Sequence, residues 1–506
     1  MKKIKVYLTD YQNFKSADIV CEPEDLSHLK EELLKKFFSI DSLKNVRVFC
    51  QDENSGYDLR QSKKLVDGNS FNGDLLEVQN GTVCGIAGMV GVLNRTVKID
   101  KEEYDVTLEM RSRFDERDKP YFLGTMLASV LQSGELFTTI ENNVASGAPD
   151  LFGFLSVTLF CSMLKSAHKS GTYKTYVRKE YNDSKLHGAI NVPRHIRLNV
   201  GRNDAVIAYA SRELTYDNEL NHLILHTWKF LKEEYASIAN ALLYGNNSDD
   251  ELYGIISELK NMTSATNIRL ERCAAKCRRP ITGPFYTEYE ELRKLCLRII
   301  SYQNKANIFS GDGENVGGIL FYSPDLWEAY LEKIMREYMK KCKRKGILKE
   351  YELKPQEKLR VYGEDTPSIR PDFVICKKTD ENELPAPVAV LDAKFRYREK
   401  TENPPWFANS DDWGDFGKLL RDMMCFGVNI GGFILPYKEK SDKAESSNTV
   451  CVPHGLGVYN KTHKICTYYM IVPCIRRCVT YREWNAALKE STNRMLESLK
   501  DNLPAL

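Results

Sequence analysis

The spacing of hydrophobic and polar residues changes along the chain and predicts three regions of different structure. In the first region, residues 4–8 and 46–49 alternate with the two-residue period of a strand, and residues 26–38 follow a helical period. Glycines crowd residues 81–91, which indicates a loop or a hairpin. We therefore expect residues 1–105 to form a small, mixed, β-rich module, to which the pattern assigns no chemistry.

The second region, residues 106–300, follows mainly a helical period. Residues 217–235 place Leu220, Ile224 and Trp228 on one face of an amphipathic helix, and residues 288–302 repeat this arrangement. The polar run at residues 245–250 predicts a connection between helices.

The third region, residues 301–482, mixes both periods. A helix is expected at residues 324–345 and another at 416–426. Apolar runs typical of strands occur at residues 359–362, 372–377, 388–395, 431–436 and 468–472. The resulting order is that of an α/β sandwich. A final helical pattern at residues 480–499 leads us to treat residues 483–506 as a C-terminal helix, and the fold class is mixed α/β.

Length and composition add limits to this picture. A chain of 506 residues is expected to contain two to four domains. It has 42% hydrophobic and 28% charged residues, and no apolar run approaches the roughly 20 residues of a membrane-spanning helix. The basic start is not followed by an apolar segment, so we expect a cytoplasmic chain without membrane contact. Its 14 scattered cysteines should then stay reduced.

Charge is concentrated locally, although the net charge is only +2. Residues 331–370 contain 12 Lys or Arg against 7 Asp or Glu, with the densest run at residues 340–345. Lys341, Lys343 and Arg344 are therefore candidates for contact with nucleic-acid phosphates. A solvated helix end before Gly346 explains the same run equally well.

Two short motifs carry the chemistry of the third region. Pro371-Asp372 opens one expected strand, and Asp392-Ala393-Lys394 lies in the next. Asp392 and Lys394 are two residues apart on a strand, so their side chains point to the same face of the sheet. Two carboxylates from neighbouring strands can share a divalent cation such as Mg²⁺, which prefers oxygen ligands. Such a cation activates water for phosphodiester hydrolysis, and an adjacent ammonium group stabilises the charge that develops.

An ordinary ion pair at a strand end would also explain Asp-x-Lys by itself. The apolar flanks of both strands argue for a functional site, because buried charges are costly unless they pair or bind an ion. Pro371-Asp372, placed 20 residues before Asp392, strengthens this interpretation. Together the motifs have the pattern of PD-(D/E)xK nucleases, with Asp372 and Asp392 as metal ligands and Lys394 beside the metal.

A third acidic residue is expected from the preceding helix. Glu328 lies at the edge of an apolar stripe that includes Trp327 and Tyr330, where it can lean toward the strands. Glu332 can fill the same role.

With these residues assembled, the chain resembles the McrC-like family, the nuclease subunits of McrBC-type modification-dependent restriction systems. Residues 326–330 (Leu-Trp-Glu-Ala-Tyr) are similar to the family's Leu-Phe-Glu-x-Tyr helix, which favours Glu328 over Glu332. Residues 370–372 and 392–394 look like its Pro-Asp and Asp-Ala-Lys motifs. Residues 111–115, 120–123 and 218–232 resemble segments of the region that precedes the nuclease domain. One departure lies on a later helix, where the family tends to have a Gln four residues before an aromatic residue. This chain has Asp422 at that position, four residues before Phe426.

The resemblance implies an endonuclease that depends on Mg²⁺ or Mn²⁺ and cleaves double-stranded DNA in defence against phage. It also implies a partner, a McrB-like AAA+ GTPase or ATPase. This chain has no Gly-x-x-x-x-Gly-Lys-Ser/Thr loop, so the motor must be a separate subunit. We expect residues 1–105 or the helical region to dock it. Lys418 and Arg421, on the helix with the departure, are candidate phosphate contacts.

Two other functions stay open: a catalytically silent nuclease fold that serves as a scaffold for the motor, and a nuclease that acts on RNA. Zinc binding was weighed for pairs of residues spaced by four, and ordinary partly buried side chains explain these pairs better. The pairs are His222 with His226, Cys273 with Cys277 and Cys474 with Cys478. Residues 452–455 indicate a turn after a strand, which makes His454 a weak candidate for a catalytic base.

Overall fold

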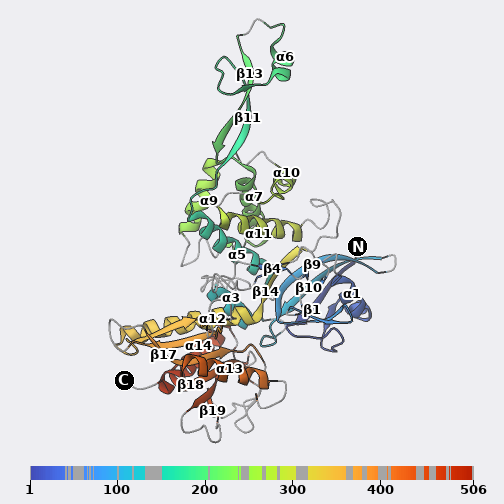
Figure 1. Cartoon of the computed structure of the whole chain (residues 1–506). Coiled ribbons are helices and arrows are strands. Elements are labelled where there is room, and N and C mark those ends of the chain that lie inside the picture. The colour runs from blue at the N-terminus through green and yellow to red at the C-terminus, as the bar shows by residue number, and fades with distance from the viewer. Residues whose placement is uncertain are drawn as a thin grey trace. The chain divides into compact units, whose positions relative to one another are not determined.

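The computed structural model divides the chain into two compact units (Figure 1). The first contains Met1–Phe152 and Ile319–Leu506, and the second contains Gly153–Gly318. The structure describes residues 2–39, 43, 47–49, 62–64, 66–67, 70–71, 73, 75–99, 102–116, 119–130, 151–202, 205–236, 239–240, 250–264, 269–281, 285–303, 317–360, 368–378, 385–396, 407, 412–439, 450–454, 463–474, 478 and 480–503.

The N-terminal part of the first unit is built on a seven-stranded sheet in the order β2-β1-β10-β9-β14-β3-β4. Its strands are β1 (Lys2–Thr9), β2 (Val20–Glu22), β3 (Arg47–Phe49), β4 (Ser62–Lys64), β9 (Met89–Ile99), β10 (Glu102–Arg111) and β14 (Gly317–Tyr322). Smaller hairpins are formed by β5 (Val66–Asp67) with β6 (Ser70–Phe71) and by β7 (Leu76–Gln79) with β8 (Thr82–Ile86). The strands expected at residues 4–8 and 46–49 are confirmed, and the expected helix is a 3-10 turn (Glu24–Leu29) followed by α1 (Lys30–Phe37).

Strand β14 joins this sheet from more than 200 residues further along the chain. It pairs in parallel with β3 and lies beside β9. Gly91 allows the close approach: its φ is +136°, and a Cβ there would lie 2.1 Å from the carbonyl oxygen of Ile319. The predicted boundary at residue 105 falls inside β10, and β14 comes from beyond residue 300. The strand period does not specify which strands pair, so these positions depend on tertiary contacts.

The second unit combines helices with a long hairpin (Figure 1). Its helices are α5 (Leu151–His168), α6 (Val192–Asn199), α7 (Glu219–Glu234), α9 (Asp250–Met262), α10 (Leu270–Lys276) and α11 (Thr287–Gln303). The helices predicted at 217–235 and 288–302 are therefore confirmed. Strands β11 (Thr175–Asp183) and β13 (Ile207–Thr215) form the hairpin, with β12 (Ala189–Ile190) on β13. Apart from Asp250, the polar run at 245–250 lies outside the described residues.

The C-terminal part of the first unit holds a six-stranded mixed sheet in the order β15-β16-β17-β18-β20-β19. Its strands are β15 (Tyr351–Pro355), β16 (Phe373–Lys377), β17 (Ala386–Ala393), β18 (Ile430–Lys438), β19 (Cys451–His454) and β20 (Lys464–Val472). Strands β17, β18 and β20 run in parallel, and the other pairs are antiparallel.

Two local predictions in this sheet need correction. Residues 452–454 belong to strand β19 and do not form a turn, because they pair with β20 and Val452 is buried. The strand predicted at residues 359–362 is represented by a single bridge between Leu359 and Ile369, and residues 361–362 lie outside the described residues.

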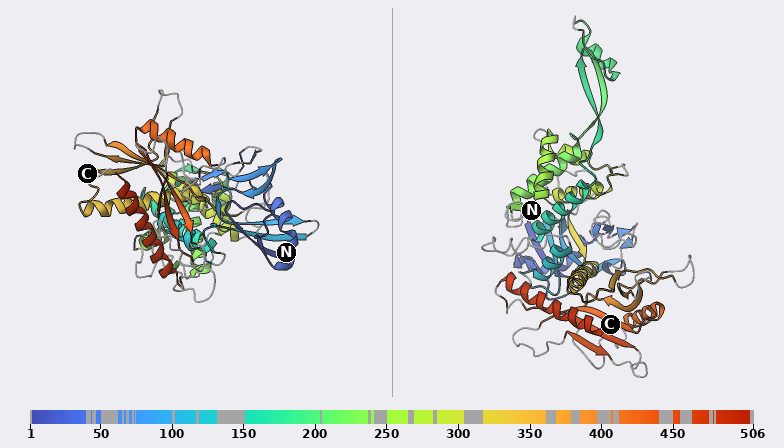
Figure 2. Two further views of the ribbon diagram at one scale, coloured as in Figure 1. Left: turned by 90° about the horizontal axis from the view of Figure 1, so that it is seen from below. Right: turned by 90° about the vertical axis from the view of Figure 1, so that its left-hand side faces the viewer.

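Helices cover both faces of the six-stranded sheet. Helix α13 (Trp413–Phe426) packs on β17 and β18, and α14 (Tyr481–Asn502) packs on β19 and β20. Figure 2 shows α13 and α14 on opposite sides of the strands. Helix α12 (Ser323–Arg344) follows β14 directly, contacts β15 and β17, and packs on α3 (Tyr121–Val130). The mixed α/β class is therefore confirmed. Within the described part of the chain, no helix is long and apolar enough to cross a membrane.

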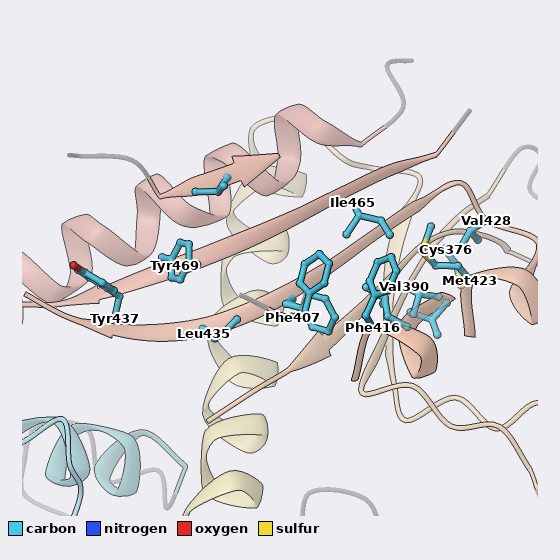
Figure 3. Close-up of a cluster of buried hydrophobic side chains, with 14 residues drawn as sticks. Cys376, Val390, Phe407, Phe416, Met423, Val428, Leu435, Tyr437, Ile465 and Tyr469 are labelled. Atoms are coloured by element: carbon cyan, nitrogen blue, oxygen red, sulfur yellow. The ribbon is translucent and has the colours of Figure 1, made fainter. Parts of the chain in front are cut away.

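A hydrophobic cluster holds α13 against the sheet (Figure 3). Phe416 and Leu419 on α13 meet Val390 and Phe433 on the strands, and Phe407 stacks on Phe416 with ring centroids 4.7 Å apart. Val390 lies two residues before Asp392, so this burial determines which face of β17 receives the next polar side chains.

A second group of aromatic rings joins the two sheets of the first unit. Phe395, which follows β17, packs against Phe114, Phe122 and Trp327, with centroid distances of 5.1, 6.5 and 6.0 Å. The Lys438 ammonium donates to the carbonyl oxygen of Asp115 at 2.8 Å, in the same region. Both contacts tie this end of the six-stranded sheet to the segment that follows β10.

We expect Phe395→Ala to lower the free energy of unfolding of the first unit by about 3–5 kcal/mol, because it removes a buried ring between two sheets. Phe285→Ala is the control, since Phe285 is 81% exposed and should change stability by less than about 0.5 kcal/mol. Urea unfolding of both variants measures the difference, and similar midpoints would contradict this packing.

Candidate active site

Asp372 and Asp392 face each other across the antiparallel pair β16 and β17. Phe373 pairs with Leu391, so Asp372 stands opposite Asp392 at the end of the ladder. The backbone N–H of Ala393 donates to Asp372 Oδ2 at 2.6 Å. Asp392 is only 2% exposed. Strand pairing therefore brings together two carboxylates that are 20 residues apart in sequence.

Two lysines neutralise Asp392. Lys394 Nζ lies 2.8 Å from Asp392 Oδ2, and Lys418 Nζ, from α13, lies 2.7 Å from Asp392 Oδ1. Lys418 Nζ is also 3.8 Å from Asp372 Oδ1, so its ammonium lies between the two carboxylates. The backbone N–H of Lys394 donates to the carbonyl oxygen of Ile434 at 2.9 Å. This bond continues the pairing of β17 with β18 one residue past the end of β17. Asp392 and Lys394 share a face, as their spacing predicted.

A second layer of charge surrounds Lys394. Asp415 Oδ1, on α13, lies 3.1 Å from Lys394 Nζ. Arg396 Nη1 lies 2.9 Å from Asp415 Oδ2 and 2.8 Å from Asp412 Oδ1. The Lys394 ammonium is thus held from two sides by carboxylates, which limits where it can point.

Glu328 reaches the cluster from α12. Gln356 Nε2 donates to Glu328 Oε2 at 3.3 Å, while the Gln356 backbone N–H donates to the carbonyl oxygen of Asp372 at 2.9 Å. Gln356 therefore links Glu328 to the start of β16. Burial of Leu326 and Trp327, the two residues before Glu328 on α12, sets the direction of Glu328.

The carboxylates differ in pKa because their surroundings differ. Burial, followed by the charges of Asp372, Asp325 and Asp392, holds the pKa of Glu328 well above its usual range. Burial and the neighbouring Asp392 raise the pKa of Asp372 to about 7. Burial alone would raise the pKa of Asp392 as well, but the ammonium groups of Lys394 and Lys418 outweigh it and lower that pKa. Of the three carboxylates, Asp392 is thus the one that stays deprotonated at neutral pH.

Burial alone would lower the pKa of Lys394, but the negative charges of Asp392 and Asp372 and the hydrogen bond to Asp392 together outweigh it and raise the pKa. Lys394 is therefore protonated at neutral pH and acts as a fixed positive charge.

This donor set suits a hard divalent cation. Asp372, Asp392 and Glu328 supply oxygen atoms only, and mutual repulsion among them is what an added cation relieves. The position of the Lys418 ammonium shows that Asp372 and Asp392 face a common point that accepts positive charge. Across the residues that the structure describes, no three Asp, Glu, His or Cys side chains are already drawn together as a metal would hold them.

The structure brings together Glu328, Asp372, Asp392 and Lys394, the four residues proposed from the sequence. Lys418, expected to contact phosphate, lies within the carboxylate cluster. Arg421 pairs with its neighbour Asp422, with Arg421 Nη2 2.7 Å from Asp422 Oδ1. Lys341, Lys343 and Arg344 lie in the last turns of α12.

Sequence reasoning missed Asp415 and Gln356. Asp415 and Lys418 are three residues apart on α13, between the apolar positions Phe416 and Leu419 that face the sheet. The spacing of Asp415 and Lys418 beside this buried apolar stripe could have indicated that both side chains lie near the sheet. Gln356 offered none, because only the fold brings β15 next to β16.

The pairs weighed for zinc have other surroundings. His222 Nε2 contacts Asp217 Oδ1 at 2.7 Å, and the buried Cys273 and Cys277 belong to α10 and its end. The described part of the chain offers none of these residues a third metal-binding partner. His454 is buried, which lowers its pKa to about 4, and its Nε2 lies 2.6 Å from the Thr467 hydroxyl.

Glu328→Gln should stabilise the metal-free protein at alkaline pH. The pKa of Glu328 is raised on folding, so the wild-type protein loses stability as pH rises from the usual glutamate range through the raised pKa. Glutamine stays neutral and avoids this loss. Urea midpoints in the presence of a chelator should therefore favour the variant at about pH 8 and converge at about pH 5.

Glu332→Gln, on the same helix, is the matched control. Glu332 Oε1 lies 2.5 Å from Nε of the exposed Arg336, so its replacement should cost about 1 kcal/mol and bring no gain at alkaline pH. An unchanged pH profile for Glu328→Gln would contradict the repulsion among the carboxylates.

A family model described as "McrBC 5-methylcytosine restriction system component" matches residues 86–413, more than half of the chain, including both strand motifs. None of the curated proteins matches this chain.

Two similar solved structures come from Thermococcus gammatolerans. The first is a half-complex of McrB AAA+ hexamers with bound McrC; it has 14% identity and a TM-score of 0.46, and the match covers 98% of this chain and 100% of that one. The second is the McrBC complex; it has 14% identity and a TM-score of 0.30, and the match covers 66% of this chain and 88% of that one. On the match to the family model, this chain belongs to the McrBC family of 5-methylcytosine restriction system components.

Proposed function

We propose that this chain is the metal-dependent DNA endonuclease subunit of a McrBC-like restriction system and acts with a separate AAA+ NTPase. One observation carries the proposal: the paired strands bring Asp372 and Asp392 together, and Lys394 forms an ion pair with Asp392. Membership of a restriction family supports DNA as the substrate. The sequence reasoning and the geometry thus lead to the same four residues.

Asp372 and Asp392 would hold a Mg²⁺ or Mn²⁺ ion, and Glu328 would assist as a ligand or through a bound water. When bound, the ion would polarise the phosphoryl oxygens and lower the pKa of the attacking water. The raised pKa values of Asp372 and Glu328 are consistent with this assignment, because a cation lowers both.

Lys394 would stabilise the negative charge that develops on the phosphoryl group, or orient the attacking water. Its proton is retained, so it suits charge stabilisation and not proton abstraction. Asp415 keeps the ammonium in place from the side of α13. Lys418 balances the two aspartates in the metal-free arrangement and is close enough to the reacting centre to contact the DNA backbone.

A silent nuclease fold that serves only as a scaffold is the alternative. The presence of Asp372 opposite Asp392, with Lys394 paired to Asp392, argues against it, because burying two neighbouring carboxylates is costly unless they serve a function. RNA as a substrate stays open and is included in the assay below.

Asp392→Ala and Lys394→Ala should each slow plasmid cleavage by at least about 100-fold in the presence of the AAA+ subunit, its nucleotide and Mg²⁺ or Mn²⁺. The two variants should differ in Mn²⁺ binding measured by calorimetry. Asp392→Ala should lose binding, because it removes a ligand, while Lys394→Ala should keep it.

Lys340→Ala is the control, since Lys340 is an exposed residue of α12. Wild-type rates in both site variants would refute the site. If the wild-type protein binds the AAA+ subunit tightly but cuts no DNA, the scaffold function replaces the proposed one. Faster cleavage of an RNA of matched sequence would assign RNA, and not DNA, as the substrate.

The AAA+ subunit, in this proposal, docks on the second unit. Helix α6 exposes the apolar side chains of Val192 and Ile196, and Val200 directly after the helix adds a third; they are 56%, 56% and 65% exposed. The polar face points inward instead: Asn199 is buried and donates to Asn182 Oδ1 at 2.7 Å. A helix that buries its polar face and exposes its apolar face is typical of a surface covered by a partner.

The N-terminal sheet offers less apolar surface. Among the described residues before residue 100, the exposed large hydrophobic side chains are Tyr11 and Val78, at 38% and 37%. Of the two docking regions considered from the sequence, the helical one is therefore favoured.

Val192→Asp combined with Ile196→Asp should weaken binding of the AAA+ subunit by about 30-fold or more, as expected for residues at the centre of an interface. Interferometry with the immobilised partner measures the affinity. Lys185→Ala, on the same hairpin, is the control and should bind normally. Unchanged binding of the double variant would contradict docking on α6 and would favour residues 1–105 as the docking region.

A further inference from the structure

Lys418 supplies positive charge to the three carboxylates of the candidate site, Glu328, Asp372 and Asp392. Its ammonium lies 2.7 Å from Asp392 Oδ1 and 3.8 Å from Asp372 Oδ1. Burial alone would raise the pKa of each of the three carboxylates, and the charge of Lys418 works against this rise at all of them. A divalent cation would act on the same carboxylates in the same direction.

Lys394 also pairs with Asp392, but its surroundings hold it more firmly. Its ammonium lies 2.8 Å from Asp392 Oδ2 and 3.1 Å from Asp415 Oδ1, and its side chain is 15% exposed. The side chain of Lys418 is 33% exposed, and its second carboxylate contact, with Asp372, has the longer distance of 3.8 Å. Of the two ammonium groups, that of Lys418 is therefore more readily displaced from Asp392.

A further carboxylate on α13 lies where a displaced Lys418 ammonium can turn. Asp422 is four residues after Lys418, so the two side chains are neighbours on one side of the helix. Asp422 is only 1% exposed. Burial raises the pKa of Asp422, and the charges of Arg421 and Lys418 offset only part of that rise. A closer approach of the Lys418 ammonium would compensate this carboxylate further.

We propose that Lys418 is a displaceable counter-ion, which competes with Mg²⁺ or Mn²⁺ for Asp372 and Asp392 and turns toward Asp422 when the cation binds. This role of Lys418 rests on the proposed function, because it concerns the same metal site. An ammonium group repels a divalent cation bound to the same aspartate, so the chain holds the cation more weakly while Lys418 stays. Lys418 thus compensates the buried aspartates and at the same time lowers their affinity for metal.

Titration calorimetry with Mn²⁺ on the full chain tests the competition. Lys418→Gln removes the charge and keeps a polar side chain, so Mn²⁺ should bind about 10-fold more tightly than to the wild type. Lys418→Arg keeps the charge and should stay within about 3-fold of the wild-type affinity. Lys354→Gln is the control, because Lys354 is a partly exposed lysine that pairs with Glu357 at 3.4 Å; it should change the affinity by less than about 2-fold.

Asp422→Asn tests where the ammonium turns. Without this carboxylate Lys418 should remain at Asp392, so Mn²⁺ should bind about 3-fold more weakly. In a protein that already carries Lys418→Gln, the same substitution should weaken binding by less than about 1.5-fold, because there is no ammonium to receive. A direct effect of the Asp422 charge on the metal would instead persist in both backgrounds.

Thermal unfolding gives a second readout that does not involve cleavage. Lys418→Gln leaves Asp392 with a single ammonium, so without added cation it should unfold at a lower temperature than the wild type. Mn²⁺ at millimolar concentration should raise the unfolding temperature more for Lys418→Gln than for the wild type, because the variant binds it more tightly. If Lys418→Gln does not fold even with Mn²⁺, Asp422→Asn decides: affinity equal to or above that of the wild type overturns the proposal.

The outcomes separate a failure of this role from a failure of the proposed function. If the wild type binds Mn²⁺ and cuts DNA, and folded Lys418→Gln binds Mn²⁺ no more tightly, only the competition by Lys418 is overturned. Equal weakening by Asp422→Asn in both backgrounds overturns the turn toward Asp422. If none of these proteins binds Mn²⁺ at millimolar concentration and none cuts DNA, the metal site itself is refuted, and the role of Lys418 with it.

Discussion

The contact on which the candidate site depends is the placement of Asp392 between two ammonium groups. Asp392 is almost completely buried, and an isolated carboxylate there would take up a proton. Lys394, directly after the same strand, and Lys418, from α13, each approach one of its oxygens and keep it charged. Burial and the neighbouring carboxylates raise the pKa values of Asp372 and Glu328, because less positive charge offsets these effects there. One well-compensated aspartate beside two poorly compensated acids is an arrangement that favours an added cation.

Packing on both sides of the sheet holds this cluster in place. On one side, α13 is fastened by apolar contacts between Phe416 or Leu419 and the strands, so that Lys418 and Asp415 are directed at the end of β17. On the other side, Phe395 is held among aromatic rings from the N-terminal part of the unit and from α12. Lys394 lies between these two anchors, and a shift of either would move its ammonium relative to Asp392.

The path of the chain connects the two sheets of the first unit. Strand β14 pairs within the N-terminal sheet and continues directly into α12, which carries Glu328. Asp10 connects the same places, since its carboxylate accepts from the Arg113 backbone N–H at 2.6 Å and from the Ser323 hydroxyl at 3.4 Å. The N-terminal sheet thus supports the helix that brings the third acid to the site. The second unit is inserted between these segments in the sequence.

The sequence by itself determined the kinds of element and the residues of the candidate site. Alternation on β17 placed Asp392 and Lys394 on one face, and the apolar flanks of Asp372 and Asp392 indicated buried strands, because periodicity is a local property of the backbone. Only the tertiary structure decided which elements meet. Three contacts join residues that are distant in sequence: the pairing of β14 with β3, the approach of Lys418 and Asp415 from α13, and the link from Glu328 to β16 through Gln356. Such contacts are selected by packing and charge compensation over the whole unit, and no local pattern records them.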